Sequence, residues 1–251
     1  MAATTYNEYY DKLYAAKDYD SEVKTLLRLF DDLYAAPVRR VLDVGCGTGR
    51  HARALAAAGM EIVGVDRDTG AIEIARNHAS EVSPKPKFLV GSVSDVHESN
   101  FDAAVSLFNV INYIMDVRAL LDFFGAIHDR LRPSAPFIFD CWNGIAVVLS
   151  PPSRKVAETI CGVETITAET LPVVNLLSQR VELTTRVRVH ADGAPRHDFP
   201  HRYQHRLWMP QDLKDLLAIA GFEVLSLSSW ARPSVPAESE TWKVLFACRR
   251  A

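Results

Sequence analysis

Short apolar runs alternate with amphipathic helical segments along the chain from residue 41 to residue 140. Parallel strands need long crossover connections, which helices usually supply, so this alternation predicts a parallel sheet with helices on both faces. The pattern resumes near residue 210, where a proline opens another helix. The strands expected for this sheet are 41–44, 61–66, 87–90, 101–107, 137–140, 222–227 and 242–248, and the helices are 20–34, 50–58, 69–77, 118–131 and 210–221.

Between residues 144 and 209, period-two stretches replace the helical pattern. Residues 181–190 alternate apolar with polar side chains, which indicates a strand with one buried face. A partner strand is expected at 199–208, and Asp192-Gly193 supplies a turn between the two. We therefore predict an antiparallel β insertion in an otherwise α/β domain, and a surface loop at the prolines of 233–236.

Composition and charge exclude several classes of protein. With 251 residues, of which 48% are hydrophobic, the chain builds one substantial core. The 28 Lys and Arg residues nearly balance the 31 Asp and Glu residues, so the net charge of -3 supplies no field to attract nucleic acid. No apolar run approaches the roughly 18 residues needed to cross a bilayer, and the first residues lack the pattern of a secretory signal. We expect a cytoplasmic protein with neither nucleic acid nor membrane as a partner.

The cysteines and histidines give no metal-binding pattern. The four cysteines are far apart and form no C-x-x-C pair, so neither a zinc site nor a disulfide framework is expected. His197, His201 and His205 recur every four residues, which would suit a helix. Pro200 and the flanking alternation favour a strand instead, so we expect no metal site.

The strongest local motif is the segment 41–50, V-L-D-V-G-C-G-T-G-R, which reads as a strand, a tight glycine turn and the start of a helix. Glycine is needed where the backbone φ is positive, or where a ligand approaches the main chain too closely for a Cβ. The next expected strand ends at Asp66, where a carboxylate can accept both hydroxyls of a ribose. Together these features indicate a nucleoside-bearing cofactor on an open α/β sheet.

Two cofactor classes use a turn of this kind. NAD enzymes place their third glycine at the position that Arg50 occupies here. Instead, glycines occupy every second position of 45–49, and the segment D-V-G-C-G-T-G resembles motif I of the class I S-adenosylmethionine-dependent methyltransferases. The resemblance implies that Asp43 orders the methionyl ammonium of S-adenosylmethionine and that Asp66 holds its ribose.

The resemblance covers most of the chain. Residues 91–96 lie where the family places the residues beside adenine, and 131–133 and 220–222 are further matches. Ser92 replaces the usual adenine acid, so either Ser92 or Asp95 is expected to hold the exocyclic amine. The residues that the resemblance assigns to the cofactor are Tyr14, Tyr19, Asp43, Gly45, Cys46, Gly47, Thr48, Gly49, Asp66, Arg67, Ser92, Val93, Leu107 and Phe108.

The family's fold is Rossmann-like and doubly wound. The resemblance implies an α/β fold with a mostly parallel seven-stranded sheet and an antiparallel β insertion. Residues 1–36 would form an N-terminal lid and helix, and residues 37–143 and 210–251 the methyltransferase domain. Residues 144–209 would form the insertion, as a substrate platform or as the interface of a homodimer.

Two sequence features concern the methyl acceptor. Enzymes that methylate amino groups of nucleic-acid bases carry an Asn/Asp-Pro-Pro-Tyr-like turn after strand four, and residues 107–110 lack both prolines. The tyrosine-rich segment 9–19 is similar to the start of small-molecule N-methyltransferases, especially those acting on amino groups of nucleotide-linked deoxysugars. In them this segment folds over the cofactor, so we expect Tyr14 and Tyr19 to line the reaction site, with Tyr14 also a catalytic candidate. Alternatively, both tyrosines only pack the leading helix against the core.

Five further side chains are candidates for binding the acceptor. Asn109 and Asn112 follow strand four and would either orient an acceptor or cap a helix. Trp142 follows strand five and would form either a pocket wall or part of the core. Arg202 and Arg206 lie on the opposite face of their strand from the histidines and would either contact a phosphate or keep the insertion soluble.

His201 and His205 are candidates for a general base, because only histidine has an unperturbed pKa near neutrality. Solvated or packing histidines are the alternative. A base is required only where the acceptor must lose a proton for the reaction to occur.

Our leading hypothesis is methyl transfer from S-adenosylmethionine to a small molecule, preferably an amine such as an amino sugar or another natural-product intermediate. Proximity and orientation would be the main catalytic effect of an in-line displacement. The alternatives are an O- or C-methyltransferase with a histidine base, a non-catalytic cofactor-binding subunit, and an NAD-dependent oxidoreductase.

Overall fold

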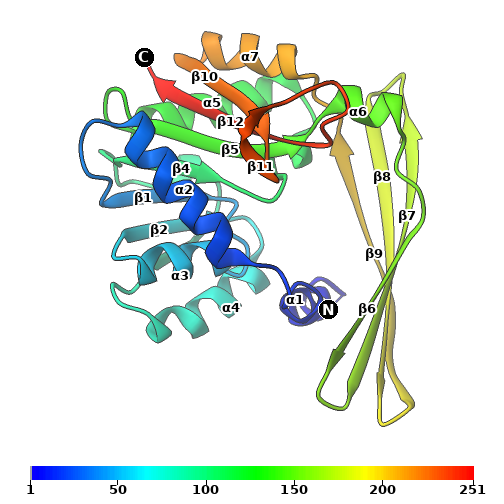
Figure 1. The fold of residues 1–251 in the computed structure, drawn as a ribbon. Coiled ribbons are helices and arrows are strands. Elements are labelled where there is room, and N and C mark those ends of the chain that lie inside the picture. Colours follow the sequence, from blue (N-terminus) through cyan, green and yellow to red (C-terminus); the bar gives the residue numbers. More distant parts are fainter. Residues whose placement is uncertain (1) are drawn as a thin grey trace.

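The central element of the computed structural model is an eight-stranded sheet in the order β11-β10-β12-β5-β4-β1-β2-β3 (Figure 1). The structure describes residues 2–251, with side chains from residue 6 onward. β1 to β5 are parallel, whereas β12 runs antiparallel to both β5 and β10. The strands are β1 (Arg40–Val44), β2 (Glu61–Asp66), β3 (Lys87–Val90), β4 (Ala103–Ser106), β5 (Pro136–Trp142), β10 (Phe222–Ser229), β11 (Arg232–Pro236) and β12 (Lys243–Arg250).

The expected doubly wound α/β fold is confirmed, with one correction to the strand count. The segment 233–236, expected as a loop, lies in the eighth strand, β11, which pairs only with β10 at the edge of the sheet. An edge strand tolerates Pro233 and Pro236 because a missing N–H costs no bond on the side that faces away from the sheet. Prolines alone therefore did not exclude a strand here.

Helices cover both faces of this sheet, because successive strand residues are apolar on both sides. Val41 packs against the helices of one face and Leu42 against those of the other, and Leu245 and Phe246 alternate in the same way. α2, α3 and α4 cover the first face, and α5 and α7 the second (Figure 1). The helices are α1 (Ala2–Leu13), α2 (Tyr19–Leu33), α3 (Arg50–Ala57), α4 (Thr69–His78), α5 (Val117–Arg130), α6 (Gly144–Leu149) and α7 (Pro210–Ile219), with short 3₁₀ turns η1 (Ala79–Glu81), η2 (Val93–Asp95) and η3 (Val110–Tyr113).

A second sheet of four antiparallel strands stands beside the main domain (Figure 1). Its order is β6-β7-β8-β9, and the expected pairing of the last two strands is confirmed, with Leu183 opposite Tyr203 and Val181 opposite His205. The sequence did not predict its other two strands, nor the short helix α6 that precedes them. The four strands are β6 (Lys155–Cys161), β7 (Glu164–Asn175), β8 (Arg180–Ala191) and β9 (Ala194–Arg206).

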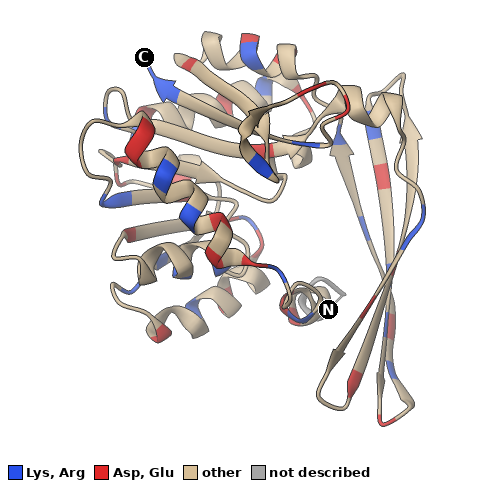
Figure 2. Cartoon of the chain, in the orientation of Figure 1, with Lys and Arg blue, Asp and Glu red and all other residues tan. Residues whose placement is uncertain are grey.

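The two faces of this insertion sheet differ in chemistry. The inner face, defined by the buried β8 residues Val181, Leu183 and Val187, packs against α1 and the main domain. The outer face carries charges of both signs, including the Arg186–Asp198 ion pair at 2.6 Å (Figure 2). Period-two alternation along β8 therefore separates an apolar side from a charged side.

Buried hydrogen bonds join the insertion to the main domain. The Asn112 amide donates to the backbone oxygen of Arg206 (2.9 Å) and accepts from the N–H of Trp142 (2.9 Å), and the residue is 0% exposed. The Arg206 guanidinium donates to the Ser178 carbonyl and to the Gln179 side chain. The Asn112 side chain therefore holds two backbone groups instead of an acceptor, whereas Arg206 keeps an Nε without a partner among the described residues, and its contact with an acceptor stays a prediction.

Arg202 lies on the face of the insertion sheet opposite to His201 and His205, as the alternation of its strand predicts. It is exposed on the outer face, in a shallow cavity that Arg186, Arg188 and Glu169 also line. This position separates Arg202 from the inner face, and its contact with a phosphate stays a prediction.

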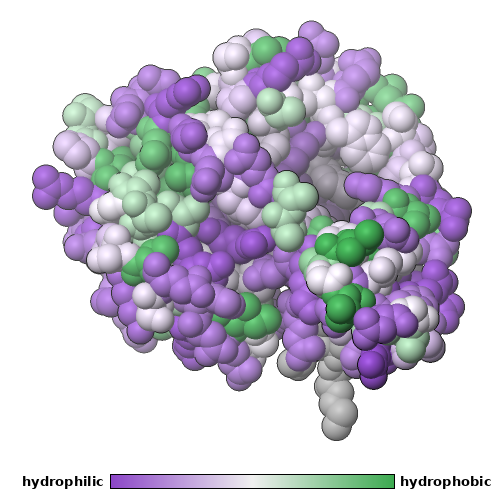
Figure 3. Space-filling view, turned by 60° about the horizontal axis from the view of Figure 1, so that its bottom comes forward, coloured by the Kyte–Doolittle hydropathy of each residue, from purple (hydrophilic) through white to green (hydrophobic). Residues whose placement is uncertain are grey.

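The surface shown in Figure 3 is mostly hydrophilic, with separate hydrophobic patches. Exposed large apolar side chains include Ile160 and Val163 near the β6–β7 turn and Leu149 at the end of α6. Within residues 2–251 no helix combines the length and the hydropathy that a membrane span requires.

Candidate active site

The glycine turn between β1 and α3 has the backbone geometry that the motif predicts. Gly45 has φ of 74°, and a Cβ built there would lie 2.5 Å from the side chain of Val110, so no larger residue fits. Gly47 has φ of 54°, and a Cβ built there would meet nothing within 4 Å. The turn is thus packed against the protein at Gly45 and open to a ligand at Gly47.

Asp66 lies at the end of β2, beside this turn. Its Oδ2 accepts from the Gly47 N–H (2.8 Å) and its Oδ1 from the Asp68 N–H (2.9 Å). Burial raises the pKa of Asp66, and the bonds from the backbone oppose that rise. The carboxylate therefore holds the turn in place and lies where the sequence places the ribose acid.

Asp43 carries an orphaned carboxylate oxygen. The residue is buried in β1, and its Oδ2 has no hydrogen-bond partner in the part of the chain that is described. Burial, followed by the charge of Asp66, raises the pKa of Asp43 to about 7. A cationic group beside this oxygen would satisfy it and lower the pKa, so the position fits an ammonium.

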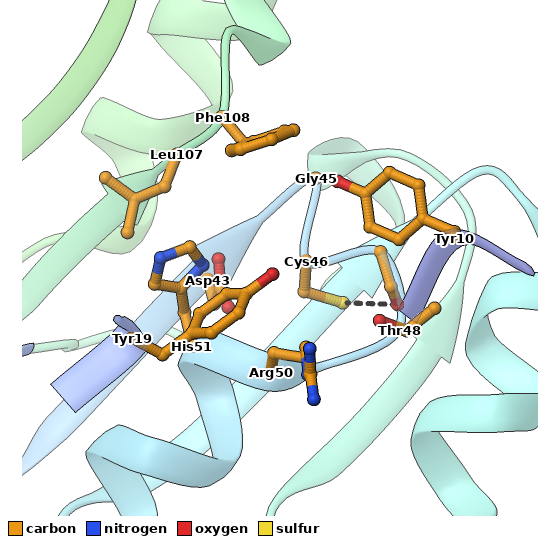
Figure 4. Close-up of a pocket in the computed structure, with 11 residues that line it drawn as sticks. Tyr10, Tyr19, Asp43, Gly45, Cys46, Thr48, Arg50, His51, Leu107 and Phe108 are labelled. Atoms are coloured by element: carbon orange, nitrogen blue, oxygen red, sulfur yellow. Dashed lines mark hydrogen bonds between the residues drawn. The ribbon is translucent and has the colours of Figure 1, made fainter. Parts of the chain in front are cut away.

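A small cavity of about 50 Å³ lies between the glycine turn, α1, α2 and the segment after β4 (Figure 4). It brings together most of the residues predicted to bind the cofactor, and three that were not predicted: Tyr10, Arg50 and His51. Arg50 and His51 lie directly after the last glycine of the motif, in the first turn of α3. This position in the sequence could have predicted them as cavity residues. The lining residues are Tyr10, Tyr19, Asp43, Gly45, Cys46, Gly47, Thr48, Arg50, His51, Leu107 and Phe108.

Other predicted cofactor residues lie outside this cavity. Gly49 packs against Phe88, Arg67 is exposed next to Asp66, and Val93 is buried. Both the N–H and the hydroxyl of Ser92 donate to Oδ2 of Asp95 (2.7 and 2.8 Å). Because the Ser92 hydroxyl is engaged in this way, Asp95 has the better acceptor for an adenine amine.

The segment after β4 forms a constrained turn over the cavity. Phe108 and Asn109 have φ of 71° and 65°, a left-handed conformation that ordinary side chains disfavour. Asp140, 0% exposed, accepts from the Asn109 N–H (2.6 Å) and pairs with Lys243 (2.5 Å). This buried ion pair holds the turn, and the side-chain oxygen of Asn109 stays buried without a partner.

Four aromatic rings line the inner face of β9 next to that turn. His205 makes edge contacts with Trp142 and with Tyr113, each with 4.7 Å between ring centroids, and Tyr203 lies 5.3 Å away. His205 is 4% exposed, and neither ring nitrogen has a partner among the described residues. Burial lowers its pKa to about 4, so the imidazole is neutral at pH 7.

The other predicted residues of the reaction site lie on either side of this group. His201 stacks on Tyr6 at 3.7 Å between ring centroids, and burial lowers its pKa. The ring of Tyr14 contacts Phe108 edge-on at 5.1 Å. Tyr14 therefore lies between the cavity at the glycine turn and the aromatic residues of β9. Residues 2–251 contain no cluster of three His, Cys, Asp or Glu side chains suited to a metal ion.

Comparisons with known proteins agree with this geometry. Residues 41–134 match the methyltransferase domain family. Over its full length the chain is 24% identical to a putative methyltransferase of Geobacillus sp. (strain WCH70), with 100% of both chains covered. It is 36% identical over 108 residues to a ubiquinone biosynthesis O-methyltransferase of Alkalilimnicola ehrlichii, a match that covers 42% of each chain. The solved structure of CalS10, an amino pentose methyltransferase of Micromonospora echinaspora, has a TM-score of 0.77 at 18% identity and covers 98% of this chain and 97% of its own.

Residues 41–134 carry a methyltransferase domain, and the chain resembles S-adenosylmethionine-dependent methyltransferases over nearly its full length. The expected enzyme class and cofactor are thereby confirmed. The site fits that cofactor on three observations made above: the orphaned oxygen of Asp43, the open side of Gly47, and Asp66 at the end of β2.

Replacing Asp66 by alanine removes the acceptor of two backbone N–H groups together with the expected ribose acid. Because a hydrogen bond to a charged group contributes about 1.5–3 kcal/mol, we expect Asp66→Ala to weaken S-adenosylmethionine binding at least about tenfold in isothermal titration calorimetry. Asp198→Ala, in an exposed ion pair of the insertion, is the control. Equal affinities for the two variants would contradict this role of Asp66.

The Asp140–Lys243 pair gives a second prediction. Asp140→Ala leaves a mostly buried lysine without its charge partner and the Asn109 N–H without its acceptor. We expect the free energy of unfolding in urea to fall by about 3–5 kcal/mol. Asp140→Asn combined with Lys243→Met keeps an acceptor and leaves no unpaired charge, so most of the stability should return. An equal loss in the double variant would show that charge pairing is not what holds the turn.

Proposed function

We propose that this enzyme transfers the methyl group of S-adenosylmethionine to an amine nitrogen of a small molecule. The observation that carries the proposal is the continuity between two sites. The cavity at the glycine turn meets the aromatic residues of β9 through Tyr6, whose ring contacts Tyr10 of the cavity lining and stacks on His201. A cofactor in the first site and an acceptor against the second would be adjacent, and such proximity is the main requirement of an in-line displacement.

In this proposal, different residues of the first site bind different parts of the cofactor. Asp43 accepts from the methionyl ammonium, and Asp66 accepts from the ribose hydroxyls. Asp95 accepts from the adenine amine beside Arg67 and Val93. The cofactor supplies a methyl group bonded to a sulfonium, and the chain supplies orientation and exclusion of water.

We also propose that α1 acts as a lid. The Thr48 hydroxyl donates to Asp11 (2.7 Å), the Asn7 amide donates to Asp68 (2.9 Å), and Tyr10 covers the glycine turn. The cavity of about 50 Å³ is far smaller than the roughly 300–1,000 Å³ of ligand sites. These bonds must therefore open before a nucleoside-sized ligand enters the cavity.

Transfer to nitrogen is supported by the state of the two histidines. Burial lowers both pKa values, that of His205 to about 4, so both rings are neutral at pH 7 and His205 is a weak base for removing a proton from an acceptor. An unprotonated amine needs no base before it attacks the methyl group, whereas a hydroxyl or carbon acceptor does. The second candidate, O- or C-methyl transfer with His201 or His205 as the base, rests on the same neutral imidazoles. A non-catalytic subunit is disfavoured by the complete glycine turn.

The proposal also covers the location of the enzyme in the cell and its partners. We propose a cytoplasmic enzyme that acts on a small molecule, with neither nucleic acid nor membrane as a partner. Charges of both signs are spread over the ribbon without one dominant field (Figure 2). The exposed apolar side chains Val156, Ile160 and Val163 on the insertion would suit the interface of a homodimer.

A metabolite screen tests the reaction type. The enzyme is incubated with methyl-labelled S-adenosylmethionine and pooled amine and phenol metabolites, and products are identified by mass spectrometry. We expect label on nitrogen, and the variant Asp66→Ala should lose it. Label found only on oxygen or carbon would favour the second candidate, and no label in any pool would reject methyl transfer to these classes.

Histidine variants separate nitrogen from oxygen acceptors. His201→Phe and His205→Phe keep the aromatic packing and remove the imidazole nitrogens. For an amine we expect kcat to stay within about tenfold of wild type with unchanged cofactor affinity, whereas loss of a general base lowers kcat about 10²–10⁴-fold. With the pKa of His205 at about 4, this ring stays neutral from pH 6 to 9, so His205 should contribute no rise in kcat over that range, measured at saturating S-adenosylmethionine so that Asp43 is paired with the ammonium.

A further inference from the structure

Over four register rows that face the reaction site, the β7, β8 and β9 residues of the inner face include no Lys, Arg, Asp or Glu, and the exposed Lys155 extends one row at the edge strand β6. Aromatic rings occupy one end of each row, on β9, and small or aliphatic residues fill the rest. The rows, from β7 through β8 to β9, are Ala168, Val187 and Phe199; Thr170, Thr185 and His201; Pro172, Leu183 and Tyr203; and Val174, Val181 and His205. We call these twelve residues the acceptor wall.

Four tyrosines, Tyr6, Tyr14, Tyr113 and Tyr203, form what we call the tyrosine cluster, in which Tyr203 belongs to the acceptor wall and the other three lie beside it. The rings of Tyr113 and Tyr203 are 5.8 Å apart, and Tyr113 is 51% exposed. Tyr6 stacks on His201 of the wall, and both Tyr6 and Tyr14 contact Tyr10 of the cavity lining. Phenol hydroxyls both donate and accept hydrogen bonds, which suits hydroxyl groups on an acceptor.

The basic side chains around this space already have partners, although Nε of Arg206 is buried without one among the described residues. Within residues 6–251, each Lys or Arg that packs on an aromatic ring near the site also bonds to an acid, an amide or a carbonyl oxygen. The pairs are Lys12 with Glu164, Lys17 with Glu22, Arg50 with Asp11, Lys243 with Asp140, and Arg206 with Ser178 and Gln179. Arg202, expected to bind phosphate, is on the opposite face of the sheet.

This distribution of charge favours acceptors without anionic groups over acceptors that carry a phosphate or a carboxylate. A phosphate or carboxylate placed against the acceptor wall would lose its water without gaining a cation, at a cost of several kcal/mol. Hydroxyl groups of an acceptor would hydrogen-bond to the tyrosine cluster. An aryl ring or the C–H face of a sugar would pack on the aromatic rings of β9. When the nitrogen lone pair forms the new C–N bond, the methyl–sulfur bond breaks and its electron pair stays on sulfur. The positive charge then on nitrogen faces aromatic rings, which stabilise cations.

We propose that the acceptor is an amine without phosphate or carboxylate groups, held between the tyrosine cluster and the acceptor wall by hydroxyl groups or an aryl ring. The proposal rests on the proposed function and narrows it. It departs from the nucleotide-linked sugars of the enzymes that the N-terminal segment resembles, because a linked diphosphate would need the arginines that this chain directs elsewhere.

Matched acceptors test the proposal. The probes are glucosamine with glucosamine 6-phosphate and tyramine with tyrosine, each pair differing by one anionic group. We expect kcat/KM for labelled methyl transfer to be at least about tenfold higher for the uncharged member. Calorimetric titration of the same probes into the enzyme loaded with S-adenosylhomocysteine should give the same order of affinity without turnover.

Two variants show where an anionic group would bind. Tyr203→Arg places a cation on the acceptor wall and should reduce or reverse the preference within each pair. Arg202→Ala, on the outer face, should leave every kcat/KM unchanged. A selective loss for the phosphorylated probe in Arg202→Ala would contradict the proposal.

The metabolite screen described above supplies an independent outcome. If its acceptor bears a phosphate or carboxylate, or if the anionic probes react as well as the uncharged ones, the proposal is overturned while methyl transfer to an amine stands. If the enzyme methylates a metabolite but no uncharged probe binds or reacts, the proposed acceptor class is also rejected. Failure to bind S-adenosylmethionine, or to methylate any metabolite, would instead reject the proposed function.

Discussion

Burial of both faces of the central sheet leaves its carboxyl edge to present polar groups to a ligand. Asp66, Phe108 and Asp140 all lie at this edge, at the ends of three different strands. β1 lies between β2 and β4: the chain runs outward from β1 through β2 to β3 and then crosses over to β4, so the strand order reverses at β1 and opens a crevice there. The glycine turn fills the base of that crevice, and the geometry of the whole site depends on the packing of helices on both faces of the sheet.

The insertion supplies what this edge lacks, namely a second wall. A Rossmann-like sheet by itself offers a cofactor site that is open to solvent, and β9 closes it with aromatic rings and neutral imidazoles. The same strand directs Arg202 to the outer face, so one alternating sequence serves two chemically different surfaces. In the arrangement that we propose, cofactor recognition and acceptor recognition therefore belong to different parts of the chain.

Local patterns predicted the main domain because each of its elements is specified by its own sequence. The apolar runs, the glycine motif and the amphipathic stripe of α2, with Val23, Leu26 and Phe30 buried, needed no distant partner to be recognised. The unpredicted elements lacked such signals. β7 contains Pro172 and alternates weakly, and the twelve residues of α1 follow no apolar stripe.

The candidate site was predicted less completely, for a related reason. Residues within the motif lie where expected, but the partners of Asn112 and Trp142 come from sequence positions about 30 and 94 residues away. A sequence pattern states which face of a strand a side chain occupies, and it does not state which backbone group that side chain meets. Tyr10 and His51 reach the cavity only because α1 and α3 are brought together by the fold.

The joint at Asn112 has a consequence for how specificity can change. Among the described residues, the Asn112 side chain bonds to backbone atoms of β5 and β9, so the joint does not depend on which side chains β9 carries. Substitutions at the positions of His201 and Tyr203 can therefore alter the acceptor while the spacing between cofactor and acceptor is retained. Such a separation of a constant joint from a variable wall would allow one scaffold to acquire new substrates through a few replacements on a single strand.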